Sequence, residues 1–156
     1  MGAWTVAEVG YSGTPLVRKL GLKAGQAVAF VGLPDSLAFL QDAADYRRIE
    51  LAPDWRALPE GVRDVIHLFT RSAAEVDLAL PVLRDMIEAD GMIWVSWPKK
   101  AAKVPTDVTE DTIRNRALAD VLVDVKVCAV DEVWSGLKLV VRREFRGAHV
   151  NAKGDR

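Results

Sequence analysis

The chain has 156 residues, 50% of them apolar, which predicts one domain with a substantial core. Its 21 basic and 22 acidic side chains nearly cancel, so no overall field draws the protein onto nucleic acid or an anionic membrane, and such binding would have to be local. The single cysteine, Cys128, excludes an internal disulfide. We expect neither a targeting segment nor a membrane span, and therefore a cytoplasmic protein.

The first predicted elements are a short helix and a buried strand. Thr14 can cap a helix whose first residue is a proline, and Gly21 can end that helix. Residues 26–32, QAVAFVG, form a compact apolar run, as expected for a strand buried on both faces. Asp35 or Ser36 then caps a helix to about residue 44.

The middle of the chain repeats this alternation of strand and helix. Residues 46–51 predict a second strand, and RDVIHLFT at 63–70 predicts a third. Ser72 and Glu75 have the spacing of a capping box, so a helix begins there. The apolar positions of this helix run on to Ile87, and Gly91 is expected to end it.

The last third predicts two more strands around a helix, and then a return strand. Residues 92–97 form one strand, Thr109 caps a helix to about residue 120, and residues 123–130 form the next strand. Ser135 and Gly136 are expected to turn the chain into a strand at 137–143. The domain therefore covers residues 1–146, and the tail at 147–156 is expected to be disordered.

Alternating strands and helices predict a three-layer α/β fold, with a mostly parallel open sheet of about six strands, helices on both faces and a C-terminal antiparallel hairpin. In such sheets ligands bind outside the carboxyl ends of the strands. Candidate site residues are therefore sought at that edge.

The segments LVRKLGLKAGQAVAFVG, RDVIHLF and GMIWVSWPK resemble, in pattern and order, the strands of class I S-adenosylmethionine (SAM)-dependent methyltransferases. The segments GYSGTPL, WPKK and DVKVCAVDEVWSGLKLVVR resemble a family of short bacterial domains of unknown function. The methyltransferase resemblance implies a Rossmann-like fold. The segment at 54–62 is too short for the third strand and helix of that fold, so this is a trimmed version.

The methyltransferase resemblance also assigns cofactor positions. It implies that Gly32 and Asp35 lie in the cofactor loop and that Glu50 is the acid that holds the ribose hydroxyls. The loop itself, VGLPDS, departs from the glycine-rich pattern, because Leu33 carries a Cβ and Pro34 lacks a backbone donor. SAM is therefore a possible but disfavoured cofactor, and the cofactor stays unknown. An acid at a strand end is also commonly just solvated.

A second group of candidates follows the strand at 92–97. Lys99 and Lys100 leave its carboxyl end, where two ammonium groups could bind phosphate or carboxylate. The loop containing Glu132 and Trp134 should open onto the same edge and bring an aromatic ring to it. The alternative is that a lysine pairs with Asp131 or Glu132 and only ties two loops together, with Trp134 as packing.

The segment GYSGT adds Tyr11 and Ser12, which could cover this edge as a lid. The simpler interpretation is a turn before the helix, because the glycine spacing fits neither a nucleophile elbow nor a phosphate loop. Two histidines and one cysteine suggest no metal site. His67 is interpreted as a core histidine, and the arginines near residue 143 as a solvated strand end, so nucleic acid is not an expected partner.

Two classes of function remain open. The first is a non-catalytic or cofactor-loop-degenerate methyltransferase-like protein that binds a small anionic ligand or a protein partner, with a homodimer as one form it could take. The second is a small SAM-dependent methyltransferase, or another enzyme with a nucleotide ligand in the strand-end crevice. The loop VGLPDS favours the first.

Overall fold

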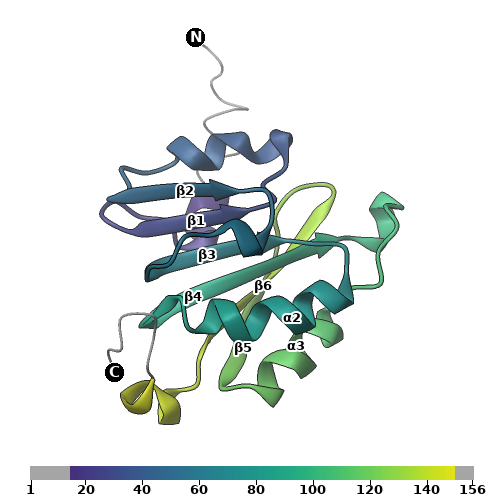
Figure 1. Ribbon diagram of the computed structural model, residues 1–156. Coiled ribbons are helices and arrows are strands. Elements are labelled where there is room, and N and C mark those ends of the chain that lie inside the picture. The colour runs from purple at the N-terminus through teal and green to yellow at the C-terminus, as the bar shows by residue number, and fades with distance from the viewer. Residues whose placement is uncertain (1–14, 150–156) are drawn as a thin grey trace.

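The computed structural model describes residues 15–149, which form one six-stranded sheet with helices against both of its faces (Figure 1). The sheet order is β2-β1-β3-β4-β6-β5. The strands are β1 (Ala27–Val31), β2 (Arg48–Ala52), β3 (Arg63–Phe69), β4 (Ile87–Pro98), β5 (Leu122–Ala129) and β6 (Trp134–Val141). The first four strands pair in parallel, and β6 runs antiparallel to both β4 and β5. The predicted fold class is confirmed.

One face of the sheet is covered by two α-helices, α2 (Ala73–Arg84) and α3 (Glu110–Ala119). Their apolar side chains, such as Leu80 and Ile113, pack with Ile66, Leu139 and their neighbours into the larger of two hydrophobic clusters. Both helices have their predicted N-caps, because Ser72 Oγ accepts from the Glu75 amide and Thr109 Oγ1 accepts from the Thr112 amide. The capping box expected at Ser72 is half formed, since the Ser72 amide donates to Thr70 Oγ1 and not to Glu75. We call this the α2–α3 face.

The opposite face is covered by the helix at 15–20 and by a 3-10 helix, η1 (Asp35–Asp42). Leu20, Leu37 and Leu40 pack here against Phe30 of β1 and Trp94 of β4. The indole N–H of Trp94 donates to the Leu20 carbonyl at 3.0 Å and so ties the first helix to the sheet. We call this the N-terminal face.

The segment between β2 and β3 is as short as the sequence predicted. It holds only the single-turn 3-10 helix η2 (Trp55–Ala57), so no further strand follows β2 and β2 is an edge of the sheet. The remaining 3-10 helices are η3 (Lys100–Ala102), after β4, and η4 (Arg143–Ala148), after β6.

Two predicted boundaries are wrong. The second long helix ends at Arg84, and Ile87 already belongs to β4, where it pairs with Arg63 of β3. Gly91 therefore does not end a helix. It lies inside β4, where a Cβ would come within 3.0 Å of the Asp64 carbonyl oxygen, so the glycine allows a close approach of two backbones. The helix expected to be capped by Asp35 or Ser36 and to run to about residue 44 is present as the 3-10 helix η1, which ends at Asp42 and has no side-chain cap.

The C-terminal part also differs from the prediction. Ser135 and Gly136 do not turn the chain but lie within β6, because Asp131 Oδ1 accepts from the Val133 and Trp134 amides and closes the turn earlier. At residues 147–149 the predicted disorder is not found, since Gly147 belongs to η4. His149 is buried, with its Nε2 3.0 Å from the Ile87 carbonyl.

Candidate functional site

The carboxyl ends of the parallel strands and the β5–β6 turn lie at one edge of the sheet. The Lys99 amide donates to the Val133 carbonyl at 2.7 Å, and Pro98 is the cross-strand partner of Trp134. The Trp134 ring in turn meets Phe69 of β3 edge-on, with centroids 5.3 Å apart. The structure therefore brings the Lys99–Lys100 corner and the acidic tryptophan turn together, as the sequence analysis expected.

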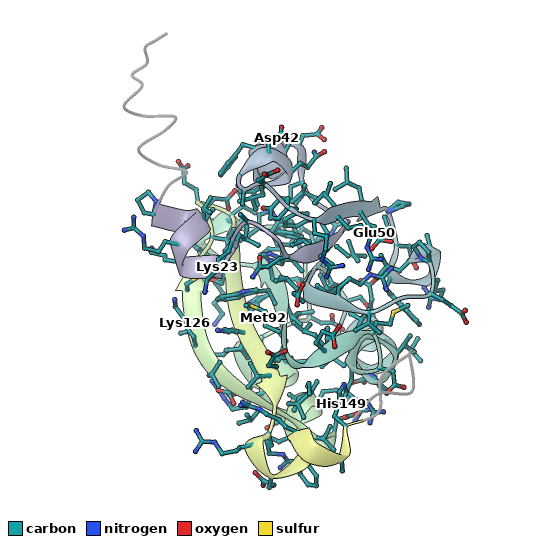
Figure 2. All side chains as sticks on the ribbon, turned by 90° about the vertical axis from the view of Figure 1, so that its left-hand side faces the viewer. Lys23, Asp42, Glu50, Met92, Lys126 and His149 are labelled. Carbon is teal, nitrogen blue, oxygen red and sulfur yellow. The ribbon has the colours of Figure 1, made fainter. Side chains whose placement is uncertain are left out.

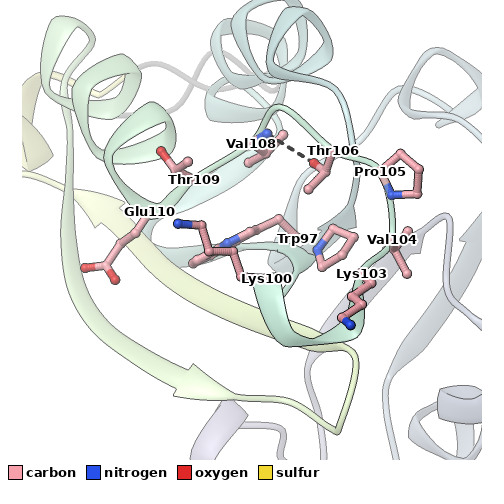
Figure 3. A pocket seen from close by; sticks show the side chains of 10 residues that line it. Trp97, Lys100, Lys103, Val104, Pro105, Thr106, Val108, Thr109 and Glu110 are labelled. Atoms are coloured by element: carbon pink, nitrogen blue, oxygen red, sulfur yellow. Dashed lines mark hydrogen bonds between the residues drawn. The ribbon is translucent and has the colours of Figure 1, made fainter.

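A cavity of about 620 Å³ opens at this edge between η3 and the start of α3 (Figure 3). Its size is within the usual range for small-ligand sites. Its lining combines apolar side chains with lysines and threonines: Trp97, Pro98, Lys100, Lys103, Val104, Pro105, Thr106, Val108, Thr109 and Glu110. We call it the lysine cavity.

The two lysines of the cavity are its cationic groups. Lys100 begins η3, and Lys103 ends it in the left-handed conformation, with φ 57°, as the only non-glycine residue of the described range with a positive φ. Such a conformation disfavours a side chain with a Cβ and is often found at functional sites. Within residues 15–149, neither lysine has a carboxylate within 4.0 Å. The Glu110 carboxylate is bound by the Arg114 guanidinium.

The outer wall of the lysine cavity is fixed to the body of the domain. Thr106 Oγ1 donates to the Arg71 carbonyl at 2.9 Å, and the Ala73 amide donates to Asp107 Oδ1 at 2.8 Å. The Val108 amide donates back to Thr106 Oγ1 at 3.1 Å, and the Val108 side chain is buried. A wall held by these contacts is formed before a ligand arrives, which lowers the entropic cost of binding.

The other rim candidates lie outside the lysine cavity. Lys99 is half-buried and holds the turn through its backbone, while Trp134 is half-buried against Phe69 and Glu132 is exposed at the turn. The ion pairs that the alternative interpretation required, from Lys99 or Lys100 to Asp131 or Glu132, are absent among the described residues. Tyr11 and Ser12 lie outside the described residues.

A second, smaller cavity of about 280 Å³ lies at the ends of β1 and β2. Gly32 and Asp35 line it, together with Leu33, Pro34 and residues 51–53. Gly32 has φ +69°, and a Cβ there would come within 3.1 Å of the Phe69 carbonyl oxygen, so a glycine is required. Leu33 packs against the core of the N-terminal face.

The donor set of this second cavity does not fit the cofactor that the methyltransferase resemblance implies. Pro34 has no amide N–H, and β2 ends in Ala52 and then Pro53. The carboxylate that lines the cavity is that of Asp35, which follows β1, so none stands at the end of β2, where the resemblance puts the acid that accepts from ribose hydroxyls. Glu50, which the resemblance assigned to that role, is the third residue of β2 and does not line the cavity. We therefore derive no methyl-transfer step.

Glu50 instead neutralises a buried arginine. Its carboxylate oxygens accept from Arg63 Nε at 2.8 Å and from Nη2 at 3.0 Å, and the Arg63 side chain is 0% exposed. Arg63 also donates to the Gly61 and Pro59 carbonyls, both at 2.7 Å. A fully buried guanidinium needs such partners, so the position of Glu50 has a structural explanation.

His67 and Ser96 form a buried polar pair on the N-terminal face. His67 Nε2 is 2.7 Å from Ser96 Oγ, and the imidazole stacks on Phe69 with centroids 4.1 Å apart. Burial lowers the pKa of His67 from 6.5 to about 3, so the ring is neutral near pH 7. The interpretation of His67 as a core histidine is confirmed.

Lys103 and Thr106, which holds the cavity wall, were not predicted from the sequence. Lys103 lies three residues after Lys100, which is one turn of a 3-10 helix. The sequence contains no pattern that predicts this short helix, so it did not show that the two lysines lie close together. Within the part of the chain that the structure describes, no group of three or more histidine, cysteine or acidic side chains is arranged to hold a metal ion, and no helix is long and apolar enough to cross a bilayer.

Comparison with solved structures finds the methyltransferase fold. The magnesium protoporphyrin IX methyltransferase of Synechocystis, solved with bound SAM, matches 86% of this chain and 78% of its own at a TM-score of 0.60 and 15% identity. A SAM-dependent methyltransferase from Aquifex aeolicus matches 83% of this chain and 89% of its own at a TM-score of 0.59 and 13% identity. A tRNA methyltransferase from B. subtilis matches 90% of this chain and 74% of its own, at a TM-score of 0.55 and 11% identity.

At these identities the likeness shows the fold alone. No protein-family model matches the sequence, and no curated protein matches it either. The expected resemblance to class I methyltransferases is therefore confirmed at the level of the fold, whereas no match supports the short bacterial family.

Proposed function

We propose that this protein uses a methyltransferase-like fold to bind a small anionic ligand in the lysine cavity, without transferring a methyl group. The observation that carries the proposal is the pair of ammonium groups, Lys100 and Lys103, that line a largely apolar cavity without a described carboxylate partner. A ligand that fits has a carboxylate or phosphate joined to an apolar body, because the floor is made by Trp97 and Val108. We also propose that the chain belongs to the family of short bacterial domains that its sequence resembles.

The test is a thermal-shift series with the purified chain. The probes are inorganic phosphate, benzoate, a nucleoside monophosphate, SAM and S-adenosylhomocysteine. A ligand present at about 100 times its dissociation constant stabilises the folded state by about 2.7 kcal/mol. For a domain of this size that corresponds to a rise of roughly 5–10 °C in the unfolding midpoint.

The matched variants are K100A/K103A and K99A. We expect the double variant to lose the shift produced by an anionic probe, while K99A keeps it, because Lys99 does not line the lysine cavity. An equal shift in wild type and K100A/K103A would refute the role of these lysines.

The alternative function is that of a SAM-dependent methyltransferase. The observation in its favour is that the second cavity lies at the ends of β1 and β2 and retains Gly32, a glycine of positive φ. If the protein is a SAM-dependent methyltransferase, SAM and S-adenosylhomocysteine raise the midpoint in the same series and K100A/K103A leaves that rise intact. We expect no rise with either compound, because the cavity offers no acid at the end of β2.

A further inference from the structure

Four lysines gather on the N-terminal face, away from the lysine cavity. Lys19 lies in the first helix and Lys23 in the turn after it, while Lys126 is in β5 and Lys138 in β6. The Lys126 ammonium donates to the Lys19 carbonyl at 2.9 Å, and Lys126 and Lys138 are direct cross-strand partners. Figure 2 shows Lys23 and Lys126 on the same side of the molecule, near Met92. We call these four residues the lysine face.

A β-bulge puts Lys126 on this face. The β5–β6 register shifts between Asp124, which pairs with Leu139, and Lys126, which pairs with Lys138. In a regular strand, residues two apart point to the same side of the sheet. Here Asp124 binds Arg114 of α3 on one side at 3.0 Å, while Lys126 contacts the first helix on the other. Bulges characteristically redirect a side chain in this way.

The arrangement is electrostatically unfavourable without an anion. None of the four ammonium groups has a carboxylate within 4.0 Å among the described residues. Like charges directly opposite each other on two strands are destabilising. The pKa of Lys138 is accordingly lowered, first by burial and then by repulsion from Lys126 and Lys23. A bound anion would relieve this repulsion.

We propose that the lysine face binds the phosphate backbone of a nucleic acid. Lysine acts as a mobile point charge that suits phosphate groups without fixing their orientation. The four lysines come from three separate segments of the chain, namely the first helix with the turn after it, β5 and β6, so the surface offers several phosphate contacts side by side and fits an extended chain of phosphates.

The exposed aromatic side chains of the described residues lie elsewhere, Phe39 on η1 and Phe145 on η4. Trp134, which is on β6 with Lys138, is half-buried and packed edge-on against Phe69. Within residues 15–149, therefore, no exposed ring lies on an element that carries one of the four lysines, and these elements offer bases no stacking platform. Binding through phosphates alone is sequence-independent, and its strength depends on salt. The nearly neutral chain does not contradict this, since the cluster is local.

The test measures fluorescence anisotropy of short labelled single-stranded RNAs of two unrelated sequences, across a range of salt concentrations. Four phosphate contacts predict a slope of log affinity against log salt of about −2.8. K126Q/K138Q, which keeps most of each stem and a donor at both positions, should lower the slope to about −1.4 and weaken binding by tenfold or more for both RNAs.

The matched control is R71A/R143A, which removes the same charge from exposed positions elsewhere. It should leave the RNA affinity within about twofold. Equal losses in the two double variants would show a general charge effect and overturn the proposal, as would the absence of RNA binding by the wild type. Inorganic polyphosphate is a separate probe with the same phosphate chemistry. If it binds and RNA does not, the nucleic-acid assignment is wrong.

Two further readouts keep the test independent of folding and of the lysine cavity. K126Q/K138Q should unfold at the same temperature as wild type or higher, because it removes a like-charge pair. It should also keep any thermal shift produced by a small anion, since Lys126 and Lys138 do not line the lysine cavity. A variant that folds, keeps that shift and still binds RNA with wild-type affinity and salt slope refutes the proposal.

Discussion

The buried pair of His67 and Ser96 should make the stability of this protein fall in mild acid. The imidazole is 1% exposed and its Nε2 is 2.7 Å from the serine hydroxyl. The aromatic rings of Phe69, Phe30 and Trp94 surround it. Protonation would place a charge in this apolar setting, so the folded state resists it and the unfolded state does not.

The size of the effect follows from the two pKa values. The folded-state pKa of about 3 lies below the ordinary value of 6.5, so the stabilisation is complete above about pH 6.5 and is lost as the pH falls toward 3. Each pH unit in this window costs about 1.4 kcal/mol. From about pH 7.5 to about pH 4.5, this one group should reduce the free energy of unfolding by about 2.7 kcal/mol.

The assay is urea unfolding of wild type and of H67F/S96A at a series of pH values in that window. The double variant removes both polar partners, because H67F alone would leave the Ser96 hydroxyl buried without a partner. Carboxylates titrate in both proteins, so the contribution of His67 is the difference between the two pH profiles. Parallel profiles would refute the assignment of a neutral, buried histidine.

Two further predictions concern stability. E50Q should cost about 3–5 kcal/mol in urea unfolding, because a neutral glutamine leaves the buried Arg63 guanidinium without its counter-charge. D54N, at a half-exposed ion pair, should cost less than about 1 kcal/mol, and equal costs for the two variants would contradict the argument. G32A should destabilise more than G25A: both have positive φ, but only at Gly32 would a Cβ meet backbone within 3.1 Å. Thermal unfolding of the two variants decides this, and equal midpoints would remove the steric explanation.

The parallel strands β1 and β3 could be predicted because both are buried on both faces of the sheet. Their sequences are therefore almost continuous apolar runs, and the two helices of the α2–α3 face begin at recognisable caps, Ser72 and Thr109. The lack of a further strand and helix between β2 and β3 could also be predicted, since the chain between these two strands is too short to form them. The start of β4 was not visible, because Ile87 follows Leu83 at a spacing that also continues the helix.

The two lysine sites differ in how far the sequence could reveal them. Lys100 follows directly from the end of β4, so its place at the carboxyl edge is a consequence of topology. Lys126 is different. In the sequence it has the same strand parity as Asp124, and only the bulge separates the two side chains onto opposite faces. A one-residue irregularity of this kind leaves no mark in hydrophobic periodicity, so the lysine face became apparent only in three dimensions.

The short connection after β2 also bears on which strand ends hold the proposed ligand site. Because no further strand follows, β2 is an edge, with Leu51 53% exposed and Ile49 40% exposed. The cavity at the end of β2 has a volume of about 280 Å³, which is less than half of the 620 Å³ at the end of β4. The end of β4, by contrast, is walled by a loop that Thr106 and Asp107 tie to the body of the domain. The cavity at the end of β4 is the larger of the two and two lysines line it, so size and charge favour the lysine cavity as the proposed anion site over the position that the resemblance assigns to the cofactor.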